Sequence, residues 1–110
     1  MILTPIRYAI IATTLFTAIV HLVLGDILTL LNGIGYIVLL VAFILPATAQ
    51  WHSQIRWALV GYTIVTIAAF FIVHADGSWQ EDGLGLMTKV VEVILVLLLI
   101  FEWQNPLAES

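Results

Sequence analysis

The chain has 110 residues, of which 63% are hydrophobic and only 9% are charged. Soluble domains carry about 25% charged residues, so this composition excludes a small soluble domain and predicts a protein of the lipid bilayer. The net charge of −4, with only three Lys and Arg residues, excludes nucleic-acid binding, which requires a basic surface. The chain has no cysteine, which excludes disulfides and thiolate metal ligands.

Four continuous apolar runs predict four membrane-spanning helices, at residues 5–24, 27–46, 55–74 and 85–103. Each run has about the 20 residues that a helix needs to cross hydrocarbon roughly 30 Å thick. The runs do not alternate between polar and apolar residues, which excludes barrel strands. We therefore expect an all-α, four-helix transmembrane bundle with up-down-up-down topology and a single domain over residues 1–110. The first run is expected to be retained, because no small-residue cleavage site follows it.

Residues typical of helix ends separate the four runs. Gly25 is predicted to end the first helix, and Asp26 is predicted to cap the second. Pro46 marks the end of the second helix, and Ser53 is a candidate cap for the third. Such short links predict that helices adjacent in the sequence are antiparallel neighbours in the bundle.

The charged and aromatic residues predict an orientation in the membrane. Arg7 and Arg56 fall on one side of the predicted bundle, and the acidic loop residues fall on the other. The positive-inside rule then places both chain ends in the cytoplasm, in an N-in/C-in arrangement. An aromatic belt is expected at that inner surface, formed by Tyr8, Trp51, Trp57 and Trp103.

Several polar side chains inside the apolar runs are expected at similar depths. A helix rises about 1.5 Å per residue, so depth above the inner belt follows from counting residues. The count places five residues roughly 15–21 Å above the belt, in the outer half of the membrane. These five are the candidate ligand- or ion-binding residues His21, Asn32, Tyr36, Lys89 and Glu92. Ionisable groups at such depths usually face the bundle interior and pair, so we expect one polar cluster that opens toward the outer face.

The inner half of the membrane is expected to hold only hydroxyl groups, such as those of Thr13, Tyr62 and Thr63. His52 lies in the predicted inner loop and is expected to be solvated. His74 comes to about 25 Å above the belt, near the outer surface.

Lys89 and Glu92 have two interpretations. In the structural one, Lys89 extends toward the headgroups or pairs with Glu92, or else a neutral, protonated Glu92 hydrogen-bonds to Tyr36 or His21. In the functional one, the two residues, together with His21, Asn32 and Tyr36, hold a proton, a cation or a small polar ligand.

The histidines likewise have two interpretations. His21 is expected to hydrogen-bond Asn32 across the short hairpin, and no cofactor is then required. Alternatively, His21 and His74 are weak candidates for metal binding, either as bis-His ligands of haem b or, with Glu92, as ligands of zinc. No H-x-x-x-H or H-E-x-x-H spacing supports the zinc interpretation.

Four short segments carry most of these candidate residues: HLVLG at 21–25, LLNGIGY at 30–36, GYT at 61–63 and TKVVE at 88–92. Their pattern resembles that of small, uncharacterised four-helix prokaryotic integral membrane proteins. The resemblance covers most of the chain and implies no activity. Small multidrug-resistance transporters differ, because they carry an essential carboxylate in the first helix and this chain has none there.

The leading functional hypothesis is non-enzymatic. In this hypothesis the chain is a structural or accessory subunit in the cell membrane. Its expected partners are the lipid bilayer and either the other subunits of a membrane complex or further copies of the chain. The alternative is a binding or transport module centred on Glu92 and Lys89. A lesser alternative is a redox protein that binds haem through His21 and His74.

Overall fold

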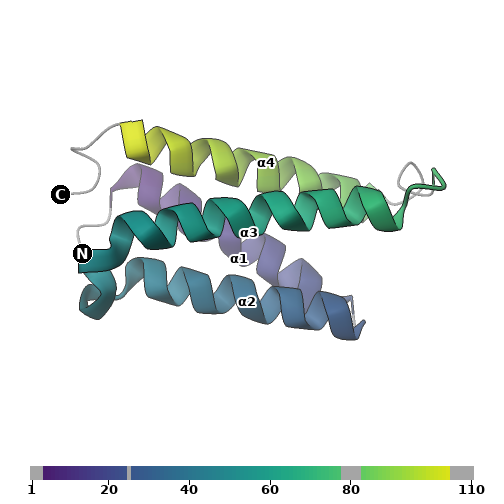
Figure 1. Cartoon of the computed structure of the whole chain (residues 1–110), viewed down its shortest axis with the longest axis horizontal. Helices are drawn as coiled ribbons and strands as arrows, with labels where there is room; N and C mark the ends of the chain where they lie inside the picture. The colour runs from purple at the N-terminus through teal and green to yellow at the C-terminus, as the bar shows by residue number, and fades with distance from the viewer. Residues whose placement is uncertain (1–3, 25, 78–82, 105–110) are drawn as a thin grey trace.

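The computed structural model describes residues 4–24, 26–77 and 83–104. Its long helices are α1 (Pro5–Val23), α2 (Ile27–Ile44), α3 (His52–Val73) and α4 (Gly83–Gln104), and a short 3-10 helix, η1 (Pro46–Trp51), links α2 to α3. Each long helix is apolar and long enough to cross a membrane. Figure 1 shows them side by side, with α1 behind α3. The predicted all-α, four-helix transmembrane bundle is confirmed.

Consecutive helices pack against one another, and α4 closes the bundle against α1. Because α1 begins and α4 ends at the same end of the bundle, we call this the terminal end (Figure 1). The opposite end, where α1 ends and α2 begins, is called the hairpin end. The bundle is 45 Å long, which matches the ~40–45 Å thickness of a bilayer with its headgroups.

The predicted cap of the second helix is confirmed. The carboxylate of Asp26 accepts a hydrogen bond from the backbone nitrogen of Leu28 at 3.1 Å, which satisfies one of the free N–H groups of the first turn. Gly25, the predicted end of the first helix, lies outside the described residues.

The predicted cap of the third helix is wrong. We expected Ser53 to precede the helix, but α3 already begins at His52, so Ser53 lies inside its first turn. α2 ends at Ile44 with Leu45 as its C-cap, directly before Pro46, as predicted; Pro46 then opens η1, which leads directly into α3. Proline is favoured in the first turn of a helix, where its missing N–H has no partner to lose.

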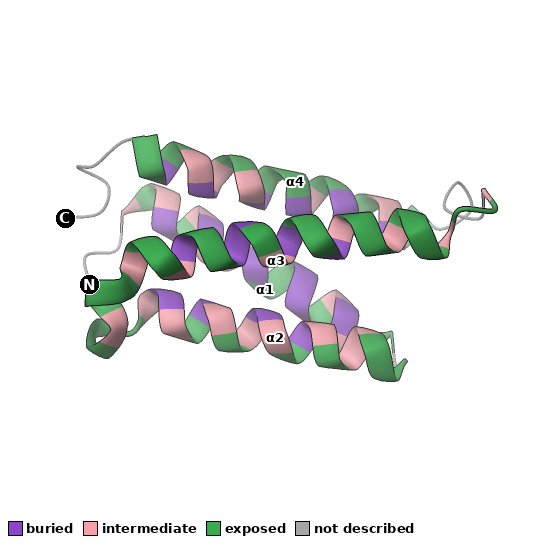
Figure 2. Cartoon of the chain, in the orientation of Figure 1, coloured by how far each residue is buried: buried purple, intermediate pink, exposed green. Residues whose placement is uncertain are grey.

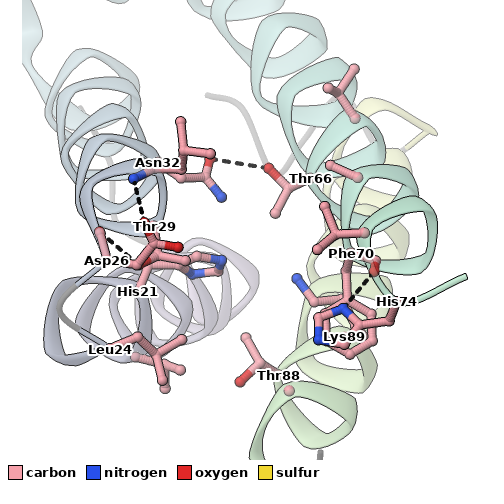
Figure 3. Close-up of a pocket in the computed structure, with 16 residues that line it drawn as sticks. His21, Leu24, Asp26, Thr29, Asn32, Thr66, Phe70, His74, Thr88 and Lys89 are labelled. Carbon is pink, nitrogen blue, oxygen red and sulfur yellow. Dashed lines mark hydrogen bonds between the residues drawn. The ribbon is translucent and has the colours of Figure 1, made fainter. Parts of the chain in front are cut away.

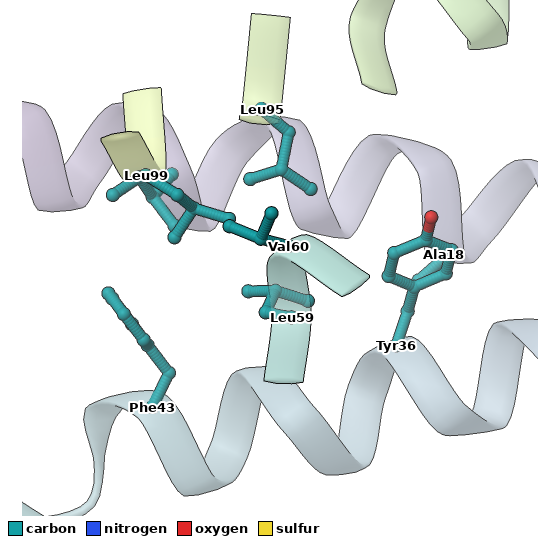
Figure 4. Packing of buried hydrophobic residues seen from close by; sticks show 8 residues of the cluster. Ala18, Tyr36, Phe43, Leu59, Val60, Leu95 and Leu99 are labelled. Atoms are coloured by element: carbon teal, nitrogen blue, oxygen red, sulfur yellow. The ribbon is translucent and has the colours of Figure 1, made fainter. Parts of the chain in front are cut away.

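The bundle has an apolar core and an apolar outer surface. Figure 2 shows the buried residues on the helix faces that point inward, and Figure 4 shows how the core side chains meet. The buried apolar residues are Ile10, Ala18, Tyr36, Leu40, Phe43, Leu59, Val60, Leu95 and Leu99. Large apolar residues such as Val23, Leu28 and Ile72 are more than 70% exposed, at 76%, 71% and 73%. Such a surface is stable only against lipid or another apolar partner.

Two glycines of α2 allow close helix packing. A Cβ atom on Gly33 would lie 2.9 Å from the backbone oxygen of Ala18, so this glycine sets how closely α1 approaches α2. A Cβ atom on Gly35 would lie 2.1 Å from the hydroxyl oxygen of Tyr62. The geometry therefore supports a packing role for both glycines rather than the opening of a pocket.

We expect Gly35→Ala to lower the free energy of unfolding by about 1–3 kcal/mol, the usual cost of overpacking. The added methyl group displaces the ring of Tyr62, whose hydroxyl donates to the backbone oxygen of Asn32 at 2.6 Å. Gly61→Ala is the matched control, because a Cβ atom there meets nothing within 4 Å. Unfolding in detergent, followed by circular dichroism, measures both variants; equal stabilities would contradict this packing.

Candidate functional site

Three helices meet at the carboxylate of Glu92, which is fully buried. The hydroxyl of Tyr36 donates to its Oε2 atom at 2.7 Å, and the hydroxyl of Thr17 donates to the same oxygen at 3.1 Å. Its Oε1 atom forms an ion pair with the ammonium group of Lys89, one helical turn earlier on α4. We call Thr17, Tyr36, Lys89 and Glu92 the Glu92 cluster. The cluster joins α1, α2 and α4 through one buried charge.

Lys89 faces the bundle interior rather than the headgroups. Its side chain is 8% exposed, and its ammonium nitrogen lies 5.3 Å from the centre of the Phe70 ring, which adds a cation–π contact from α3. The structure therefore shows Lys89 paired with Glu92 and not extended along the membrane surface.

The expected hydrogen bond between His21 and Asn32 is replaced by other contacts. His21 Nδ1 lies 2.7 Å from the backbone oxygen of Thr17, a carbonyl within reach in its own helix. Asn32 Oδ1 instead accepts from the hydroxyl of Thr66 on α3 at 3.2 Å. His21 therefore bonds within α1, whereas Asn32 links α2 to α3.

A cavity of about 480 Å³ lies between the Glu92 cluster and the hairpin end. Figure 3 shows His21 and Asn32 on the wall formed by α1 and α2, opposite Lys89, Phe70 and His74 from α3 and α4. Its polar lining residues are His21, Asp26, Thr29, Asn32, Thr66, His74, Thr88 and Lys89. Of the five predicted site residues, His21, Asn32 and Lys89 line the cavity, whereas Tyr36 and Glu92 belong to the packed layer beneath it.

A second buried polar cluster lies at the terminal end, where we expected only hydroxyl groups. Glu102 is fully buried, and its Oε2 atom accepts from Arg7 Nε at 2.9 Å. Its Oε1 atom lies 2.8 Å from His52 Nε2 and 3.2 Å from Arg56 Nη1. We call these four residues the Glu102 cluster. The predictions that the inner half holds only hydroxyls and that His52 is solvated are both wrong.

One sequence signal does point to Glu102. Residues 92, 95, 99 and 102 follow the i, i+3, i+7, i+10 spacing of a single helix face, and all four are buried. Glu92 is expected inside the bundle. Glu102 lies on the same face of the helix, so it is also expected to point inward, at the other end of α4. Arg7 and Arg56 had been used only as markers of orientation.

No family model, curated protein or solved structure matches this chain. Within residues 4–24, 26–77 and 83–104, no group of three or more His, Cys, Asp or Glu side chains is placed to hold a metal ion.

Proposed function

We propose that this protein is a non-enzymatic accessory subunit in the cell membrane, in which the Glu92 cluster holds the helices together. The observation that carries the proposal is the fully buried carboxylate of Glu92, which accepts hydrogen bonds from Tyr36 and Thr17 and forms an ion pair with Lys89, all within the same chain. A transported proton or cation would have to displace one of these partners. The geometry therefore favours a structural role over a transport site centred on Glu92.

The outer surface supports the accessory role. The intramembrane acids Glu92 and Glu102 are both paired inside the bundle, so the described outer surface between the ends is largely apolar. The described residues form almost no structure beyond the helices and their short links. Contacts with partner subunits, or with further copies of the chain, are therefore expected through helix faces inside the membrane.

The accessory role is tested by purifying the tagged chain from its native membranes in a mild detergent and identifying bound proteins by mass spectrometry. We expect one or a few membrane proteins, or further copies of the chain, in fixed stoichiometry. A chain that elutes alone as a monomer, under conditions that keep a known membrane complex intact, would refute the role.

We also propose the N-in/C-in orientation, which the absence of native cysteine makes simple to test. Ala49→Cys lies in η1 at the terminal end, and Asp76→Cys lies beyond α3 at the hairpin end; both positions are exposed. In intact cells, a membrane-impermeant maleimide is expected to label Asp76→Cys and to leave Ala49→Cys unlabelled. The reverse pattern would show that the orientation is inverted.

A further inference from the structure

We infer that the cavity at the hairpin end binds a neutral amphipathic molecule, whose apolar ring or chain carries a hydroxyl group. The inference does not depend on the accessory role. It also differs from a cation site at Glu92, because neither Glu92 nor Tyr36 lines the cavity.

The size and the walls of the cavity suit a small organic ligand. Its volume of about 480 Å³ lies within the range of roughly 300–1,000 Å³ that is typical of small-molecule sites. Its apolar lining residues are Val20, Leu24, Leu28, Val65, Ala69, Phe70 and Val73. The rings of Phe70 and His74, which both line the cavity, stack at 4.4 Å and 30°. Most of the ligand's surface is therefore expected to be apolar.

His21 supplies a hydrogen-bond acceptor. Its Nδ1 atom lies 2.7 Å from a backbone oxygen, which can only accept, so Nδ1 carries the proton of the neutral ring. The other ring nitrogen, Nε2, is then an acceptor. Because His21 lines the cavity, this acceptor is available to a ligand that carries an O–H group.

Asn32 supplies the matching donor. Its side-chain oxygen already accepts from Thr66, which leaves its amide nitrogen as the atom that can donate to a ligand. Among the described residues, no hydrogen-bond partner is found for that nitrogen. Figure 3 shows Asn32 and His21 on the same wall of the cavity. A single hydroxyl group can therefore donate to His21 and accept from Asn32.

The charges around the cavity favour a neutral ligand. Among the described lining residues, Lys89 is the Lys or Arg side chain, and it is already paired with the fully buried Glu92. An anionic ligand would bring a second negative charge close to that carboxylate, and Asp26 in the lining would also repel it. A cationic ligand would meet the ammonium group of Lys89. Burial of an unpaired charge here is costly, whereas a neutral hydroxyl needs only the two hydrogen bonds described above.

The test uses three probes of nearly equal size: 2-naphthol, naphthalene and 2-naphthoate. Each is titrated into the purified full-length chain in detergent near neutral pH, and binding is measured by equilibrium dialysis against protein-free micelles. We expect saturable binding of 2-naphthol that is at least about tenfold tighter than binding of either other probe, since one well-placed hydrogen bond is worth about 1.5 kcal/mol. Asn32→Leu and His21→Phe should reduce 2-naphthol binding to the level of naphthalene, whereas Thr13→Val, whose hydroxyl bonds its own helix, should not.

A cavity-filling variant keeps the test decisive if the polar variants fail to fold. Ala69 is exposed and lines the cavity, so Ala69→Phe is expected to abolish binding of all three probes while the chain stays folded. Equal binding of naphthalene and 2-naphthol would overturn the polar site and leave an apolar void that accepts a hydrocarbon chain. Tighter binding of 2-naphthoate would overturn the neutral class, and absence of saturable binding by every probe would overturn the site itself.

Discussion

Glu102→Gln is expected to lower the free energy of unfolding in detergent by about 3–5 kcal/mol, the usual cost of breaking a buried ion pair from one side. The carboxylate of Glu102 is the shared acceptor of Arg7, Arg56 and His52, and both guanidinium groups are only 2% exposed. Glutamine has no negative charge, so two buried cations would lose their common counter-ion. Because these residues come from α1, α3 and α4, the loss is expected to loosen the whole terminal end.

Reversible unfolding in mixed micelles, followed by circular dichroism, measures this effect. Gln54→Ala is the surface control, because Gln54 is exposed and a surface change usually shifts stability by less than about 0.5 kcal/mol. If Glu102→Gln were as stable as this control, the Glu102 cluster would not be a stabilising element of the fold.

Glu92→Leu is expected to cost a similar amount, about 3–5 kcal/mol, because it leaves the ammonium group of Lys89 buried without its partner. The hydroxyls of Tyr36 and Thr17 lose their acceptor at the same time. Tyr36→Phe removes only one hydrogen bond to the carboxylate and should cost less, about 1.5–3 kcal/mol. The same unfolding assay ranks these variants.

This ranking separates the structural interpretation of Glu92 from the transport interpretation. A site that carries protons or cations would lose flux in proteoliposomes when Glu92 is replaced, while the bundle would keep its stability. The structure predicts the opposite result. Variants of Glu92 are expected to be less stable than the native protein, and the native protein is expected to show no ion flux.

The parts of the fold that follow from local sequence were predicted well. Four runs of apolar residues gave four helices, because hydrocarbon allows only backbone that is hydrogen-bonded within the segment. Asp26 was recognised as a cap because its short acceptor side chain directly precedes an apolar run. The inward placement of Glu92 followed from the cost of exposing charge to lipid, whereas the sequence left open whether Lys89 pairs with Glu92 or extends to the headgroups.

Features that depend on contacts between distant helices were not predicted. The helical spacing from Glu92 places Glu102 on an inward face, but it does not reveal the partner of Glu102, because Arg7 is 95 residues away in the sequence. His52 was assigned to a solvated loop because its buried partner, Glu102, lies 50 residues away in the sequence. The contact of His21 was not predicted because a helical histidine can reach a backbone carbonyl of its own helix. The contact of Asn32 was not predicted because its partner, Thr66, lies on another helix, α3.

The central claim, that the Glu92 cluster locks the bundle, is tested most directly by a double-mutant cycle between Glu92 and Lys89. The free energies of unfolding of Glu92→Leu, Lys89→Leu and the double variant are measured in the same micelles as the native chain. Because the double variant leaves no unpaired charge inside the bundle, we predict that it is more stable than Glu92→Leu, with a coupling energy of at least about 2 kcal/mol. Strictly additive losses would show that the two side chains do not interact inside the bundle and would contradict the lock.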